Sequence, residues 1–137
     1  MKLISYLTFD GQAEEAFKFY EKALQGKITA MMPHAGTPAA EHVPKEQLAK
    51  IMHACMEVGD QTLMASDAMA GQYQKPVGIS VSLHVNNPEE ASRVFNALAE
   101  GAQKIAMPIQ ETFWSPRFGM LTDRFGIPWI VNCNPAM

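Results

Sequence analysis

The stretch Thr112 to Asn132, TFWSPRFGMLTDRFGIPWIVN, is the most informative part of the chain for its architecture. It is typical of two strands joined by a tight turn at Asp123-Arg124-Phe125-Gly126, with the second strand at Pro128 to Asn132. Gly126 can supply the positive φ that such turns commonly need. Two bulky aromatics and then Ser115-Pro116 come first, so the chain bends as it approaches the turn. We therefore predict that the chain closes with a β-hairpin.

Further upstream, two stretches have apolar residues at helical spacing, and they match each other at a constant offset. Glu14-Glu15-Ala16 corresponds to Glu89-Glu90-Ala91, 75 positions later (89 − 14). The same offset pairs Gly26 with Gly101, each of which is placed to end its helix. Before the second helix, Asn87-Pro88 supplies an N-cap and a proline at the first helical position. Such self-similarity is typical of a duplicated unit.

Each copy is predicted to be one βαβββ module, which makes the fold class α+β. The expected boundaries are 1–68 for module one, 69–76 for a linker and 77–137 for module two. The first copy has predicted strands at Lys2–Phe9, Lys27–Met32, Ile51–Val58 and Gln61–Asp67, with a polar loop at Pro33–Lys50, and the second opens with Val77–Val85. One helix covers one face of a four-stranded sheet, so the other face needs a second module. We expect curved mixed sheets around a ligand cavity.

Composition limits the possible partners and locations. The chain has 137 residues, with 47% hydrophobic and 18% charged residues, as expected for one globular domain. A net charge of −3 predicts no basic face for nucleic acid. No apolar run approaches the ~18 residues of a membrane span, and the N-terminus has too short an apolar core for a secretory signal. Cys55 and Cys133 lack CxxC spacing, so we expect buried thiols and a cytoplasmic protein.

Strand alternation predicts which side chains face the cavity. The first strand would direct Ser5, Leu7 and Phe9 inward. Ile79, Val81, Leu83 and Val85 would lie under the second helix, and Met52, Ala54, Met56 and Val58 under the first. The other inward-facing residues are predicted to be His53, Cys55, Glu57, Met64, Ser80, Ser82, His84, Ile130 and Asn132. The pocket would be mostly apolar with a few polar groups.

His53 is the best catalytic candidate, although it could also be a wall residue bonded to a neighbour or part of a displaced metal site. For Cys55, strand parity places no histidine as an activating base, so an inert thiol is expected. Arg117 could pair with an anionic group of a ligand or with Asp123. Trp114 could cap the pocket or fill the module junction. The loop residues His34 and His42 are expected to be exposed.

Phe113-Trp114, Arg117-Phe-Gly119 and Asp123-x-Phe-Gly126-x-x-Trp129 together resemble the C-terminal signature of PhnB-like proteins. That family lies in the vicinal-oxygen-chelate superfamily, with glyoxalase I, bleomycin-resistance proteins and extradiol dioxygenases. The resemblance covers nearly the whole chain and implies the glyoxalase/bleomycin resistance-like fold. It also implies a homodimer, because superfamily members commonly dimerise, often with modules exchanged between chains.

The resemblance also bears on metal. Metal-dependent members hold His, Glu or Gln at four inner positions, which fall here on Ser5, Met64, Ser80 and Ile130. None is a good ligand for a divalent ion. The implied function is binding or modification of a small apolar metabolite or xenobiotic, without the usual metal or another cofactor. The alternative is a metal-dependent lyase, isomerase or dioxygenase with a displaced site involving His53. Methyl transfer finds no support, because no Gly-rich nucleotide-binding turn follows a strand.

Overall fold

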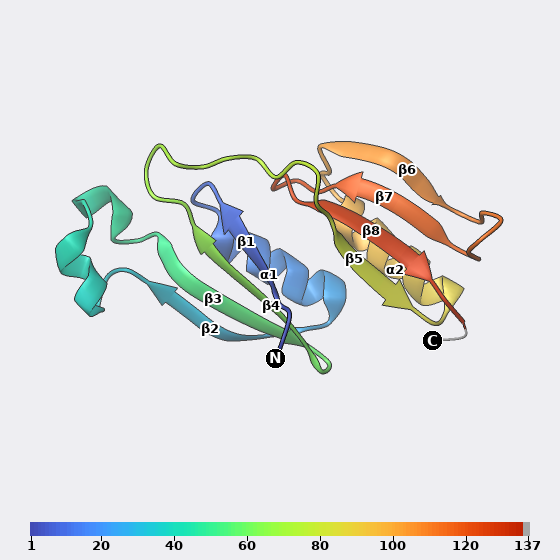
Figure 1. The fold of residues 1–137 in the computed structure, drawn as a ribbon, viewed down its shortest axis with the longest axis horizontal. Coiled ribbons are helices and arrows are strands. Elements are labelled where there is room, and N and C mark those ends of the chain that lie inside the picture. Colours follow the sequence, from blue (N-terminus) through green and yellow to red (C-terminus); the bar gives the residue numbers. More distant parts are fainter. Residues whose placement is uncertain (136–137) are drawn as a thin grey trace. The chain divides into compact units, whose positions relative to one another are not determined.

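The computed structural model describes residues 1–135, which form two compact units, one ending at Gln74 and the other beginning at Lys75. The division falls inside the predicted linker, Met69–Pro76. Each unit consists of one helix packed on one face of a four-stranded sheet (Figure 1). None of the helices in the described part of the chain is long and apolar enough to cross a membrane.

The first unit has the strand order β1-β4-β3-β2, in which β1 is parallel to β4 and the other neighbours are antiparallel. Its elements are β1 (Ser5–Phe9), α1 (Ala13–Leu24), β2 (Lys27–Pro33), the short 3₁₀ helices η1 (Pro38–His42) and η2 (Lys45–Gln47), β3 (Ile51–Val58) and β4 (Gln61–Asp67).

The second unit repeats this topology with the order β5-β8-β7-β6, again with a parallel outer pair, β5 and β8. Its elements are β5 (Val81–Val85), α2 (Pro88–Ala99), β6 (Lys104–Gln110), β7 (Phe118–Thr122) and β8 (Pro128–Cys133). The prediction of an α+β fold made of two βαβββ modules is confirmed.

The core of each unit lies between its helix and the sheet. In the first unit, Phe9 packs edge-on against Phe17 of α1, with ring centroids 6.5 Å apart, and also contacts Tyr20. In the second unit, Phe95 of α2 lies over Gly119 of β7, where an added Cβ would be 2.6 Å from the Phe95 ring. A glycine at this strand position therefore lets the helix approach the sheet closely.

Two buried carboxylates tie the ends of elements together. Asp67, at the end of β4, accepts hydrogen bonds from Ala13 N (2.9 Å) and Ile51 N (2.8 Å), so it joins the starts of α1 and β3. Asp123 does the same within the predicted turn, which the structure confirms. Its Oδ1 accepts from Phe125 N and Ile127 N, and its Oδ2 accepts from Trp129 Nε1 at 2.8 Å.

The first strand of each unit is shorter than predicted. β1 begins at Ser5 rather than Lys2, and β5 begins at Val81 rather than Val77. The pairings with the neighbouring parallel strands start at Ser5 with Leu63 and at Val81 with Trp129, so residues 2–4 and 77–80 form no ladder with them. Ile79, predicted to lie under the second helix, therefore precedes the sheet and is 71% exposed.

The long loop between β2 and β3 also differs from its prediction. His42 is exposed as expected, but His34 is buried, and its Nδ1 has no hydrogen-bond partner. The backbone explains this: His34 N donates to Lys50 O at 3.1 Å, and Ala35 N donates to Leu48 O at 2.9 Å. These bonds extend the hairpin beyond β2 and hold the start of the loop against its end.

Candidate functional site: the open faces of the two sheets

We call the face of each sheet that is turned away from its own helix the open face. Alternating burial identifies it. In β4, Leu63, Ala65 and Asp67 are buried while the residues between them are half-buried, and β8 alternates in the same way. On β3, Ala54 and Met56 are buried on the helix side, which leaves His53, Cys55 and Glu57 on the open face, as alternation predicts.

On β1 the predicted face is wrong by one residue. Leu7 and Phe9 are buried on the helix side, so Tyr6 and Thr8 belong to the open face. Ser5 is exposed and shares the parity of Leu7. The cause is loop length: three residues separate β1 from α1, but only two separate β5 from α2. The helices match at an offset of 75 (88 − 13) and the preceding strands at 76 (85 − 9), so Ser5 corresponds to Val81 and Tyr6 corresponds to Ser82.

Because of this error, Tyr6 was not predicted to lie on the open face. Its side chain contacts His53. The Tyr6 hydroxyl lies 3.1 Å from His53 Nδ1, and the two rings are stacked with centroids 5.8 Å apart. The pair spans β4, where Met64 lies opposite Cys55. Because Nδ1 is engaged by Tyr6, Nε2 is the ring nitrogen left for a further partner. His53 is thus an oriented, half-buried imidazole, and Met32 of β2 pairs with it in register.

The open face of the second unit carries a hydrogen-bonded chain of three side chains. Ser82 Oγ lies 2.8 Å from His84 Nε2, and Asn132 Nδ2 lies 3.3 Å from His84 Nδ1. With the Asn132 amide donating to Nδ1, the Nε2–H donates to Ser82, and the hydroxyl proton of Ser82 points away. Asn132 Oδ1 is buried and has no hydrogen-bond partner. Sequence alternation predicted these three residues on one face but not their mutual contact.

An aromatic cluster adjoins this polar chain. Phe118 pairs with Asn132 in register, and Met120 pairs with Ile130. The sheet surface next to the three hydrogen-bonded side chains is therefore apolar on this side. The Trp114 ring packs edge-on against Phe118 with centroids 5.3 Å apart, and Trp114 is 53% exposed. The structure therefore brings Trp114, Ile130, Asn132 and Ser82 to one region of the second unit. Phe118 was not predicted, although its alternation with Gly119 could have indicated its face.

Two other predicted site residues lie outside this group. Ser80 is exposed and precedes β5. Arg117 donates from Nη1 to Pro116 O at 2.8 Å. A contact that the sequence did not suggest holds this segment: buried Ser115 donates from Oγ to Cys133 O (2.9 Å) and lies 2.8 Å from Arg117 O. Both cysteines, Cys55 and Cys133, are free thiols.

The donor set at the superfamily's metal positions can be corrected from the strand register. Met64 and Ile130 pair with Tyr6 and Ser82, not with Ser5 and Ser80. A thioether, an isoleucine, a phenol and a hydroxyl do not suit a hard or borderline divalent ion. Within residues 1–135, no group of three His, Cys, Asp or Glu side chains is arranged to hold a metal ion. The residues present do not fit the usual metal of this superfamily.

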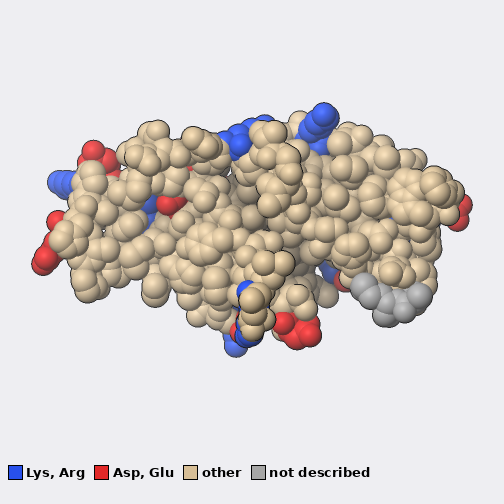
Figure 2. All heavy atoms as spheres, in the orientation of Figure 1, with Lys and Arg blue, Asp and Glu red and all other residues tan. Residues whose placement is uncertain are grey.

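Charged side chains are sparse on the surface seen in Figure 2, where Lys and Arg occur as separate groups and not as a continuous patch. Among the described residues that pair across the open face of the second unit, the charged one is Lys104, which pairs with Thr122. Thr122 lies four residues along β7 from Phe118, which corresponds to roughly 13 Å. The residues that pair with Ser82 and Asn132 from the neighbouring strands, Ile130 and Phe118, are uncharged.

Comparison with known proteins gives a consistent picture. The model of the family described as 3-demethylubiquinone-9 3-methyltransferase matches residues 1–132. Protein YjdN of Escherichia coli (strain K12) is 34% identical over 96% of this chain and 95% of its own length. Protein PA1353 from Pseudomonas aeruginosa has a solved structure with 45% identity, a TM-score of 0.89 and 98% coverage of both chains.

Two further structures extend the comparison. A PhnB protein from Bacillus cereus, described as a putative 3-demethylubiquinone-9 3-methyltransferase, is 25% identical with a TM-score of 0.81, covering 98% of this chain and 100% of that one. The fosfomycin resistance protein FosX from Listeria monocytogenes has a TM-score of 0.66 at 8% identity, covering 98% of this chain and 92% of that one. At that identity the likeness concerns the fold alone.

Proposed function

We propose a small-molecule-binding function for this chain, which belongs to the PhnB-like family described as 3-demethylubiquinone-9 3-methyltransferase, within the glyoxalase/bleomycin resistance superfamily. The ligand would be a small, largely apolar metabolite or xenobiotic held on the open faces of the sheets. One observation carries the proposal: each open face has one histidine that is oriented by a neighbouring polar side chain, on a face that also carries apolar side chains. Tyr6 orients His53, and Asn132 orients His84.

This composition is the one that small-molecule sites usually have, namely an apolar lining with a few precisely placed polar groups. In the first unit, Met32 pairs with His53 in register. In the second unit, Ile130 pairs with Ser82 and Phe118 pairs with Asn132, so apolar residues adjoin both hydrogen-bond partners of His84. A nucleic acid would instead need a row of cations to contact its phosphates. The proposal needs no metal, because the donor set described above does not fit one.

The description of the family names a methyl transfer, and this chain offers little support for that reaction. A nucleotide-type cofactor is commonly held by a glycine-rich turn between a strand and a helix. Here the turn after β1 has the single glycine Gly11, and the turn after β5 is Asn86-Asn87. Binding, with or without a reaction on the ligand, is the function that the side chains support best.

The test uses His53→Ala, with His42→Ala as the matched control at an exposed loop histidine. Binding of a neutral apolar fluorophore, N-phenyl-1-naphthylamine, is followed by fluorescence. We expect His53→Ala to weaken binding several-fold while the unfolding free energy falls by about 1 kcal/mol or less. Both variants should remain folded, and His42→Ala should bind like the wild type.

Two results would contradict the proposal. If His53→Ala lost its cooperative unfolding transition, His53 would be structural. If the protein carried one divalent ion per chain that His53→Ala abolished, the metal-dependent alternative would replace it. Such an ion at a thousandfold excess over its Kd would stabilise the native state by roughly 4 kcal/mol, a shift of several degrees in Tm.

A further inference from the structure

The hydrogen-bonded chain on the second unit has an outer end that a ligand can reach. Ser82 and His84 are exposed, whereas Asn132 is half-buried and its Oδ1 is fully covered. Asn132 therefore serves to orient the imidazole from below. The atoms presented to a ligand are the Ser82 hydroxyl and the His84 ring edge.

The hydrogen bonds that link Asn132, His84 and Ser82 can run in either direction. When Asn132 donates to His84 Nδ1, Ser82 accepts from Nε2–H and offers its own proton to a ligand. When the amide is turned over, Nδ1–H donates to Oδ1, and Ser82 donates to Nε2 and offers lone pairs. A ligand group that can both donate and accept a hydrogen bond matches either arrangement. A hydroxyl has this property, and a carboxylate does not.

The charges near Ser82 also favour a hydroxyl over a carboxylate as the ligand group. A carboxylate placed beside Ser82 would need a cation to offset its loss of hydration. Lys104 is on the edge strand β6, three strands away from Ser82 on β5, and the residue that pairs with Ser82 is the uncharged Ile130. A neutral hydroxyl needs no such partner.

The aromatic cluster determines the rest of the ligand. Phe118 lies two strands away from His84, with Asn132 between them, which is about 10 Å at the usual strand spacing. A substituted benzene ring spans much of that distance. The half-exposed Trp114 ring, packed edge-on against Phe118, offers a face on which such a ring can lie.

We infer that the open face of β5, β8 and β7 binds a neutral aromatic molecule bearing a hydroxyl, which hydrogen-bonds to Ser82 and His84 while its ring lies on Trp114 and Phe118. This inference rests on the proposed small-molecule function and specifies the ligand class and the module that recognises it.

The test compares three probes of the same shape at pH 7.5: 4-ethylphenol, ethylbenzene and 4-ethylbenzoate. Their binding to the full chain is measured by ligand-observed NMR titration. We expect 4-ethylphenol to bind about five- to tenfold more tightly than either of the others, because one hydrogen bond to a site of this kind is worth about that factor. Ser82→Ala should remove the preference while leaving the binding of ethylbenzene unchanged.

Two further variants make the outcome decisive. Trp114→Ala should weaken all three probes by a similar factor, and Asn96→Ala, at an exposed position of α2, should change none of them. Equal binding of the three probes, tighter binding of 4-ethylbenzoate, or a preference for the phenol that survives in Ser82→Ala would overturn this inference alone. A failure of every probe, and of the fluorophore used for His53, would overturn the proposed function as well.

Discussion

Asp123 explains the spacing of the aspartate, phenylalanine, glycine and tryptophan in the closing stretch of the chain. Its side chain is fully buried and accepts hydrogen bonds from two turn amides and from the indole of Trp129. The two amides fix the turn, and the indole holds the following strand against it. The stretch that carries the family resemblance is therefore a structural motif in its own right, separate from the polar groups of the open face.

Replacing this carboxylate should destabilise the protein strongly. Asp123→Ala leaves buried N–H donors without an acceptor, and we expect the free energy of unfolding to fall by about 3 kcal/mol or more. Urea denaturation followed by circular dichroism measures the change. The control is Asp60→Ala in the exposed Gly59-Asp60 turn, which should change stability by about 0.5 kcal/mol or less. Equal effects of the two substitutions would refute the structural role given to Asp123.

Residue-level predictions succeeded where alternation alone decided the outcome. His53 and Cys55 lie on the predicted face because a regular hairpin sets their parity from both sides. The prediction for Leu7 was wrong: Leu7 is buried on the helix side of β1, and one more loop residue separates β1 from α1 than separates β5 from α2. Contacts such as that between Tyr6 and His53 could not be predicted from the sequence, because they join strands that are not neighbours in the sheet.

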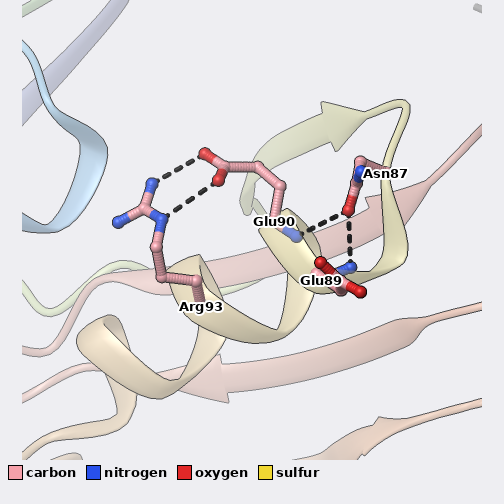
Figure 3. A network of polar contacts seen from close by, with 4 residues as sticks. All are labelled: Asn87, Glu89, Glu90 and Arg93. Atoms are coloured by element: carbon pink, nitrogen blue, oxygen red, sulfur yellow. Dashed lines mark hydrogen bonds and ion pairs between the residues drawn. The ribbon is translucent and has the colours of Figure 1, made fainter.

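Among the elements, α2 has the most completely described start (Figure 3). Asn87 Oδ1 accepts from Glu89 N at 2.8 Å and from Glu90 N at 3.1 Å, which confirms the predicted N-cap. Glu90 pairs with Arg93 through two hydrogen bonds, of 3.0 and 2.7 Å. The Arg93 guanidinium lowers the pKa of the Glu90 carboxyl below 4.5, so this pair stabilises the fold above that pH and the contribution is lost as the pH falls through the lowered pKa.

Removing the cap should have a moderate effect. Asn87→Ala deprives two amides of their acceptor, and we expect a loss of about 1 kcal/mol in the free energy of unfolding. Thermal denaturation at neutral pH gives the measurement, with the adjacent exposed Asn86→Ala as control. If the two substitutions had the same effect, the cap would not contribute to stability.

The ends of elements show where sequence reasoning was less accurate. The left-handed residue after α1 is Gln25, with φ 54°, and not Gly26. Gly26 is required for a different reason, because an added Cβ would lie 2.9 Å from Glu57 O of β3. A glycine after a helix predicted the boundary correctly, but the nature of the constraint depends on a strand 31 positions away (57 − 26).

On the scale of the whole molecule, the duplication gives each unit a sheet face that its own helix does not cover. In both, the helix covers one face of the sheet, while the open face carries half-buried apolar residues such as Met64 and Ile130. The described chain also has several exposed large apolar side chains, namely Leu3, Val77, Ile79, Phe113 and Trp114. Exposed apolar surface on this scale is typical of proteins that bind a ligand or another chain.

We therefore expect the protein to form a homodimer in solution, with the open face of each unit covered by a unit of the same chain or of its partner. Light scattering during gel filtration at ten micromolar should give a mass near 30.2 kDa, twice the 15.1 kDa of one chain. A stable interface of this kind buries about 1,200 Å² or more. We expect the same mass after roughly tenfold dilution. Replacing the exposed Val77 and Ile79 with serine tests whether the segment before β5 takes part. A mass of one chain at every concentration would refute the homodimer.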